Sequence, residues 1–195
     1  METDFDNLKG KVIVISGASG SGKGTMIRKL LEKNPDFVWS VSATSRPMRE
    51  GEVDGEDYYF LSEREFEQMI GDEEFFEWAY NHKAFYYGTP KAPILKALRE
   101  GKTVVMEINY EGYLNVKKML PEHVLSSVFI LPPSEDVLRR RILERNEMSE
   151  QDLKNRLEYS LKKEMEHADM YDTQFEPVDG DIDRSFDEFE KVVLG

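Results

Sequence analysis

The chain has no cysteine and no long apolar run. Zero cysteines among 195 residues exclude disulfide bonds and thiolate metal sites. A membrane-spanning helix needs about 20 consecutive apolar residues, and no segment of this sequence approaches that length. The start of the chain, Met1-Glu2-Thr3-Asp4, has none of the character of a secretory signal. We therefore expect a cytoplasmic protein without a membrane partner.

Positive charge is also scarce. The chain has 26 Lys and Arg against 39 Asp and Glu, which gives a formal net charge of -13. Nucleic acids are bound by exposed basic stripes, so this balance argues against a nucleic-acid partner and requires local arginines for any bound phosphate. The three histidines, His82, His123 and His167, fall in different predicted elements and form no i,i+4 pair. We therefore predict no metal site built from protein side chains.

Glycines, by contrast, gather in one loop. The segment follows the apolar run 12–15 and precedes a helical pattern that starts with Met26 and Ile27. It consists of Gly17, Ala18, Ser19, Gly20, Ser21, Gly22, Lys23, Gly24 and Thr25. A strand, a glycine loop and a helix in this order wrap a polyphosphate with backbone N–H groups, while Lys23 adds a point charge. A glycine-rich turn that binds nothing is the alternative, and the complete G-x4-G-K pattern disfavours it.

One position departs from the usual loop. Gly24 stands where a Ser or Thr hydroxyl commonly binds Mg²⁺, and a hydroxyl appears only at Thr25. We therefore expect phosphates and water to hold the metal.

The remaining pattern alternates strands and helices. Strands are predicted at 12–15, 37–41, 58–60, 75–79, 84–87, 103–108 and 128–131. One helix is predicted to begin with Thr89 as its N-cap and Pro90 as its first residue, and further helices are predicted after residues 109, 134, 149 and 184. Such alternation predicts a doubly wound α/β fold with a parallel sheet, whose ligands lie at the carboxyl ends of the strands. At this length the chain fits one domain: a core at about 8–41 and 90–195, a small mixed lobe at about 42–89 and an Arg-rich lid at about 134–158.

The long loop after the second predicted strand carries a dense motif. Residues 40–60 read SVSATSRPMREGEVDGEDYYF, and F-x-E-W at Phe75–Trp78, Y-G-T at Tyr87–Thr89 and P-P-S at Pro132–Ser134 follow in the same order. Over roughly residues 11–170 the chain resembles the guanylate kinase family. The resemblance implies a P-loop nucleotide kinase fold, ATP and Mg²⁺, and phosphorylation of GMP, and of dGMP, to the diphosphate in purine nucleotide metabolism.

The resemblance also implies functional residues. The catalytic set is Lys23, Arg46, Arg141, Arg145 and Arg156, and the acceptor-binding set is Ser42, Arg46, Arg49, Glu52, Tyr58, Glu77, Tyr87, Gly88, Thr89, Glu107 and Asn109.

Their own chemistry agrees with these roles. The guanidinium groups of Arg46 and Arg49 suit a phosphate, and a carboxylate such as that of Glu77 accepts from guanine N1–H and N2–H together. A hydroxyl such as that of Ser42 or Thr89 can donate to guanine O6. Without the motif, a solvated loop with casual ion pairs would explain the same charges.

Two departures from the family pattern stand out. The family has D-x-D-x-Q-G after the third core strand, whereas this chain has Glu107 and then Asn109. Residues 176–181 stand where the family has an apolar strand and an Asn-Asp turn, so the adenine contact there is open.

Two alternatives to GMP phosphorylation remain at this stage: a kinase for another small phosphate acceptor, and a non-catalytic guanylate kinase-like binding module. The sequence leaves the oligomeric state open between monomer and homodimer.

Overall fold

The computed structural model describes most of the chain. The described residues are 5, 7–18, 20–81, 85–132, 134–145, 149–158, 162, 165–178 and 180–195, without the side chains of Asn81, Glu144, Arg145 and Arg156. None of the helices in this described part is long and apolar enough to cross a membrane.

A parallel sheet forms the centre of the molecule. The order of its described strands is β2-β7-β1-β8-β9, and every neighbouring pair is parallel. Their bounds are β1 Lys11–Gly17, β2 Phe37–Trp39, β7 Thr103–Glu107, β8 Leu125–Ile130 and β9 Thr173–Phe175. The glycine loop therefore leaves the carboxyl end of a central strand, where α/β folds place their ligands.

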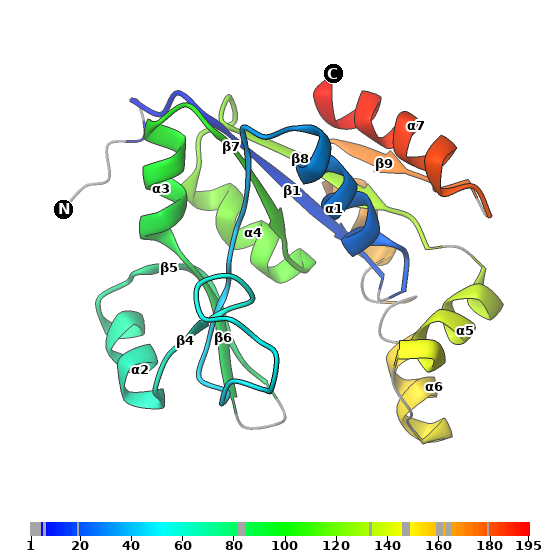
Figure 1. The fold of residues 1–195 in the computed structure, drawn as a ribbon, viewed down its shortest axis with the longest axis horizontal. Helices are drawn as coiled ribbons and strands as arrows, with labels where there is room; N and C mark the ends of the chain where they lie inside the picture. The colour runs from blue at the N-terminus through cyan, green and yellow to red at the C-terminus, as the bar shows by residue number, and fades with distance from the viewer. Residues whose placement is uncertain are drawn as a thin grey trace.

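Helices cover both faces of this sheet (Figure 1). One face packs on α1 Lys23–Lys33 and α7 Ile182–Leu194 through a cluster that includes Ile27, Leu30 and Phe189. The other packs on α3 Lys91–Arg99 and α4 Tyr110–Met119 through Leu98, Tyr113 and their neighbours. Since both faces are buried, the central strand β1 carries the continuous apolar run 12–15.

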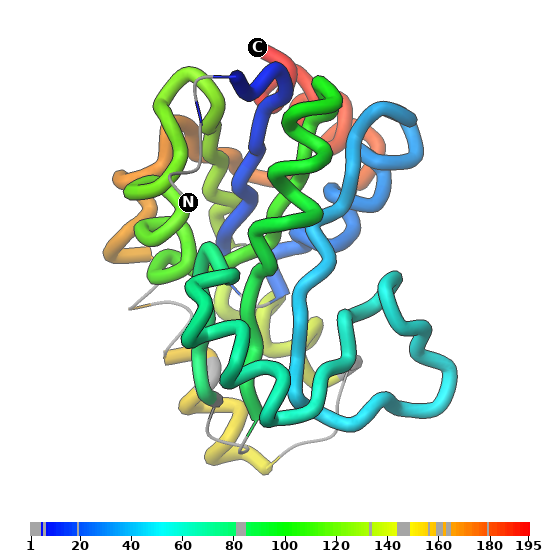
Figure 2. The backbone as a smooth tube through the Cα atoms, turned by 90° about the vertical axis from the view of Figure 1, so that its left-hand side faces the viewer, coloured from blue at the N-terminus to red at the C-terminus, as the bar shows by residue number. Residues whose placement is uncertain are grey.

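A second, smaller sheet lies beside the core. Its described order is β4-β3-β6-β5, with β3 Ala43–Thr44, β4 Tyr59–Phe60, β5 Phe75–Asn81 and β6 Phe85–Pro90. It mixes parallel and antiparallel pairs and packs on α2 Glu63–Gly71 through Phe66 and Phe75, whose rings stack 4.4 Å apart. The loop between β3 and β4 extends outward from this lobe (Figure 2).

The Arg-rich segment forms two helices, α5 Glu135–Arg145 and α6 Glu150–Glu158, on the side of the core opposite the small lobe (Figure 1). A 3₁₀ helix, η2 Met165–Met170, then returns the chain to β9. The start of α1 lies between the lobe and these helices, so both can reach a ligand held by the glycine loop.

Most predicted elements are confirmed, and three details are wrong. Thr89 lies in β6 and Pro90 is the N-cap of α3, because the β6 ladder to β5 continues as far as Pro90. The strand predicted over 37–41 ends at Trp39. No strand is predicted from the sequence at Thr173–Phe175, where β9 pairs with β8 in the structure.

Candidate active site

The glycine loop has the backbone that a phosphate cradle requires. Gly17, Gly20 and Gly22 have φ values of 144°, 88° and 102°, which L side chains rarely adopt. A Cβ atom at Gly17 would also lie 2.3 Å from the carbonyl oxygen of Ile130. The backbone N–H groups of Thr25 and Met26 donate to the carbonyl oxygen of Gly22 at 3.0 and 3.2 Å, so α1 begins directly at this loop, and the positive end of the helix dipole favours an anion there.

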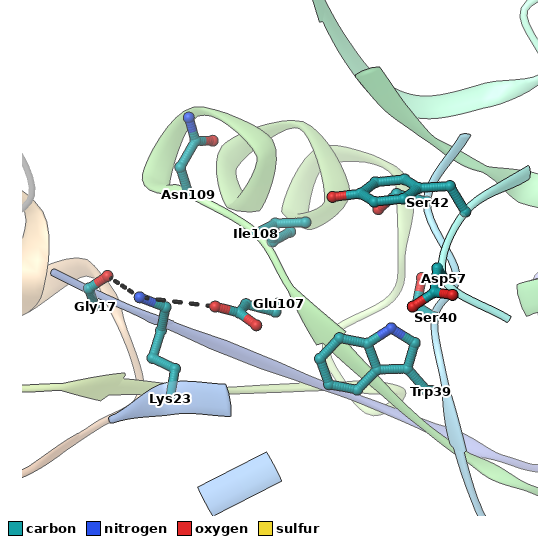
Figure 3. A pocket seen from close by; sticks show the side chains of 10 residues that line it. Gly17, Lys23, Trp39, Ser40, Ser42, Asp57, Glu107, Ile108 and Asn109 are labelled. Carbon is teal, nitrogen blue, oxygen red and sulfur yellow. Dashed lines mark hydrogen bonds and ion pairs between the residues drawn. The ribbon is translucent and has the colours of Figure 1, made fainter. Parts of the chain in front are cut away.

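Lys23 lies over this loop. Its Nζ donates to the carbonyl oxygens of Gly17 and Ala18 at 2.6 and 3.0 Å, and lies 3.8 Å from Oε1 of Glu107 at the end of β7. The ammonium group is thus held where the carboxyl ends of β1 and β7 meet, as Figure 3 shows.

One cavity joins the core to the small lobe. Its volume is about 390 Å³. The core lines it with Gly17, Lys23, Glu107, Ile108 and Asn109, and with Trp39 at the end of β2 and Ser40 after it (Figure 3). Ser42 lines it from just before β3, and Asp57 and Tyr58 line it from the loop between β3 and β4. The loop that can hold a triphosphate and the segment predicted to hold a monophosphate thus open into the same space.

Arg46 is a buried cation of the lobe. It is 7% exposed, and its two terminal nitrogens donate to the two carboxylate oxygens of Glu52 at 2.9 and 2.7 Å. The pair lowers the pKa of Glu52 to about 2, mainly through the Arg46 hydrogen bonds and secondly through the backbone N–H of Arg49. Glu52 thus engages Arg46 through both carboxylate oxygens and orients its guanidinium plane.

Aromatic rings surround the same guanidinium group. Its central carbon lies 5.4 Å from the ring of Tyr58 and 5.5 Å from that of Phe60. Tyr58 and Tyr87 meet edge to face at 6.1 Å, and burial raises the pKa of Tyr58, which keeps its hydroxyl protonated as a donor. Arg49 differs, because its side chain is exposed at the tip of the loop.

Glu77 and Thr89 form a cross-strand pair. They are register partners in β5 and β6, next to a register shift, and the Thr89 hydroxyl donates to Oε1 of Glu77 at 2.5 Å. Burial raises the pKa of Glu77, and the Thr89 hydrogen bond partly opposes that shift. Gly88 beside them has no room for a side chain, since a Cβ would lie 2.8 Å from the Glu77 carbonyl oxygen.

The first turn of α4 meets Glu77. A Cβ at Gly112 would lie 3.2 Å from Cγ of Glu77 and 3.3 Å from Oδ1 of Asn109. Asn109 itself is the N-cap of α4, and its Oδ1 accepts from the N–H of Gly112 at 2.9 Å. The side chain that replaces the family's acidic residue thus has a structural partner here.

The lid helices contact the glycine loop directly. Nη1 of Arg141 donates to the carbonyl oxygen of Gly20 at 3.2 Å, and Ala18 packs with Leu138 and Ile142 of α5. A second cavity of about 340 Å³ lies between the glycine loop, Arg140 and Arg141, and the segment 177–185. Nη1 of Arg139 lies 3.4 Å from Oε1 of Glu150 in α6. Ser19 and the side chains of Arg145 and Arg156 lie outside the described residues.

Sequence reasoning missed several site residues. Trp39, Ser40, Asp57 and Ile108 line the shared cavity, but none carries a motif signal of its own. Gly112 is the last residue of the E-x-N-x-E-G run at 107–112, and its place in that run was the available hint to its role in the site. No group of three or more His, Asp and Glu able to hold a metal occurs in the described part of the chain.

Comparison with known proteins identifies the relatives. A family model described as guanylate kinase matches residues 9–194. The guanylate kinase of Caldanaerobacter subterraneus subsp. tengcongensis is 44% identical over 188 residues, covering 95% of this chain and 87% of the relative. That of a Nostoc species is 42% identical over 193 residues, covering 99% and 94%. The crystal structure of guanylate kinase from Anaplasma phagocytophilum superposes with a TM-score of 0.72 at 29% identity, covering 96% of this chain and 86% of that one. The chain belongs to the guanylate kinase family.

Proposed function

We propose that this chain transfers the γ-phosphoryl group of ATP to GMP, giving ADP and GDP, through the shared cavity between core and lobe. The observation that carries the proposal is that Lys23 and Tyr58, from the two halves of the molecule, line one cavity. Two substrates held there meet without a carrier, so the reaction is a direct transfer.

The glycine loop is assigned to the donor. Backbone N–H groups at the start of α1 and the ammonium of Lys23 would hold the β- and γ-phosphates. The exposed carboxylate of Glu107, 3.8 Å from Lys23, fits a Mg²⁺ ion held mainly by phosphates and water. When bound, the Mg²⁺ ion would neutralise part of the negative charge on the phosphoryl group that is transferred.

The lobe is assigned to the acceptor. Arg46, oriented by Glu52, together with Arg49, Tyr58 and Tyr87, would hold the phosphate of GMP, while Glu77 and Thr89 would bind guanine. Adenine carries a different donor and acceptor pattern on that edge, and unpaired buried groups would cost about 1–3 kcal/mol each. Ser42, Gly88 and Asn109 complete the proposed pocket, and dGMP is an expected second substrate.

The lid completes the proposed mechanism. Arg141, with Arg145 and Arg156, would neutralise the charge that spreads over the transferring group in a loose transition state. A phosphate monoester oxygen is already a nucleophile near neutral pH, so no general base is required. Closure of lid and lobe would exclude water from the transfer.

Membership of the guanylate kinase family disfavours the two alternatives, which are a kinase for a different acceptor and a non-catalytic binding module. The positions of Arg46 beside Glu52 and of Arg141 beside the glycine loop also disfavour them. The proposal includes a role in purine nucleotide metabolism and a cytoplasmic location, for which the absence of cysteine is the support. It makes no choice between monomer and homodimer.

The test compares acceptors and one variant. ADP release should be fast with GMP and dGMP and at least about 100-fold slower with AMP and UMP, since several hydrogen bonds are mismatched at once. Lys23→Met should lower kcat by about 100-fold or more with little change in GMP binding measured by calorimetry. Equal rates with all four acceptors would overturn the guanine assignment, and an unchanged kcat in Lys23→Met would overturn the phosphate assignment.

A further inference from the structure

Ser21 lies in the middle of the glycine loop and carries a buried hydroxyl group. The residue is 1% exposed, and its Oγ has no hydrogen-bond partner among the described residues. Its backbone N–H is used, donating to the carbonyl oxygen of Ala18 at 3.0 Å. Burying a hydroxyl without a hydrogen-bond partner destabilises the folded chain.

Three other buried serines have hydrogen-bonded hydroxyl groups. Ser16 donates to the carbonyl oxygen of Ile108 at 2.5 Å, and Ser185 donates to that of Asp181 at 2.7 Å. Ser127 bonds to Oδ2 of Asp172 at 2.8 Å. Folded proteins pair nearly all such groups, so an unpaired one calls for a specific reason.

The surroundings of Ser21 point to an acceptor on a ligand. Ser21 lines the cavity of about 340 Å³ that Gly20, Gly22, Thr25 and Arg141 also line. These neighbours supply a helix N-terminus and a guanidinium group, so an anion is favoured there. A rotation about χ1 moves Oγ between rotamer wells without moving the loop, and phosphate oxygens are strong hydrogen-bond acceptors.

We propose that the Ser21 hydroxyl is a donor-side binding group, which donates a hydrogen bond to an oxygen of the phosphate chain of ATP. This inference rests on the proposed function, which uses only the backbone of this residue. It assigns to the side chain a role in holding the donor nucleotide and none in binding the acceptor. The phosphate chain would supply the hydrogen-bond acceptor that the described residues do not give to this hydroxyl.

The test is Ser21→Ala, with Ser127→Ala as the matched control. Both variants remove one buried hydroxyl, but only Ser127 has partners in the fold. Calorimetry with Mg·ADP and with inorganic tripolyphosphate should show both binding to Ser21→Ala about tenfold more weakly, a ratio that corresponds to about 1.4 kcal/mol. The KM for GMP should not change. Ser127→Ala should bind both probes like the parent chain.

The unfolding temperature gives an independent measurement, in which the two variants should differ from the parent in opposite directions. Without nucleotide, Ser21→Ala should unfold at the same temperature as the parent or about 2–4 °C higher, because an unpaired group is removed, whereas Ser127→Ala should unfold several degrees lower. Parental binding of both probes to Ser21→Ala would overturn the inference. Weaker ADP binding with parental tripolyphosphate binding would also overturn it, because the contact would then lie on the nucleoside. Failure of the parent chain itself to phosphorylate GMP would refute the proposed function instead.

Discussion

Glu77 is a buried titratable residue of the lobe and is also the residue proposed to select guanine. Burial raises the pKa of its carboxyl, so the proton is favoured in the folded chain. The stability from this shift is present at acid pH and is lost as the pH rises through the raised pKa. Guanine N–H donors need the ionised form, so acceptor binding should have the opposite pH dependence.

We therefore expect the KM for GMP to rise as the pH falls below neutrality, by at most about tenfold per pH unit from this group. Glu77→Gln removes the titration and should flatten that part of the profile while lowering the preference for GMP over AMP. The acceptor phosphate, whose second pKa is near 6, titrates in both proteins, so the difference between the two profiles isolates Glu77. Parallel profiles would contradict the assignment.

Gly112 makes room for that same carboxylate. In Gly112→Ala the new Cβ would lie 3.2 Å from Cγ of Glu77, so the side chain must shift. Overpacking of this kind costs about 1–3 kcal/mol, and we expect the KM for GMP to rise about tenfold with the KM for ATP unchanged.

Gly71→Ala is the control for this change. It lies in α2 of the same lobe, and a Cβ there meets nothing within 4 Å. Its KM for GMP should equal that of the parent. A similar rise in both variants would mean that the lobe as a whole, and not Glu77, responds.

At the scale of elements, the lid depends on one helix face. Ile142 of α5 is 2% exposed and packs with Ala18 of the glycine loop, whereas Leu143, the next residue, is 43% exposed. Removing a buried Ile side chain costs about 2–5 kcal/mol, here at the joint between lid and loop.

We expect Ile142→Ala to lower kcat by about tenfold or more, since Arg141 loses its orientation on the loop. Leu143→Ala should leave kcat within about twofold of the parent. Steady-state kinetics on both variants, with circular dichroism to verify folding, tests this. Equal kcat values in the two variants would show that lid docking does not require this contact.

For the whole molecule, the two proposed substrate sites belong to separate layers. The lobe has its own sheet and apolar cluster, and the core has others; α4 and β5 supply the contact between them. A limited interface permits rigid-body closure. We expect GMP with a non-hydrolysable ATP analogue to lower the radius of gyration measured by small-angle X-ray scattering more than either ligand does alone. Equal effects of GMP alone and of the pair would contradict closure by both sides.

Local signals were sufficient for much of the fold. The capping box at Ser62 and Glu65 starts α2, and the apolar run 12–15 lies within β1. Such features depend on residues a few positions apart, so they are legible in the chain. The boundaries at Thr89 and Trp39 were wrong because strand pairing with distant segments, which sequence does not display, sets where a strand ends.

The linear sequence determined the chemistry available to this protein: a glycine loop with Lys23, an arginine-bearing loop around Arg46, and a carboxylate at Glu77, all recognisable because glycine conformations and charge spacings are local properties. Only the tertiary structure decided which of these groups are held in place. Glu52 engages Arg46, Thr89 bonds Glu77 across a strand pair, and Gly112 approaches Glu77 from another layer. Those contacts depend on strand register and helix packing, whose partners are far apart along the chain and are brought together only when the apolar faces are buried.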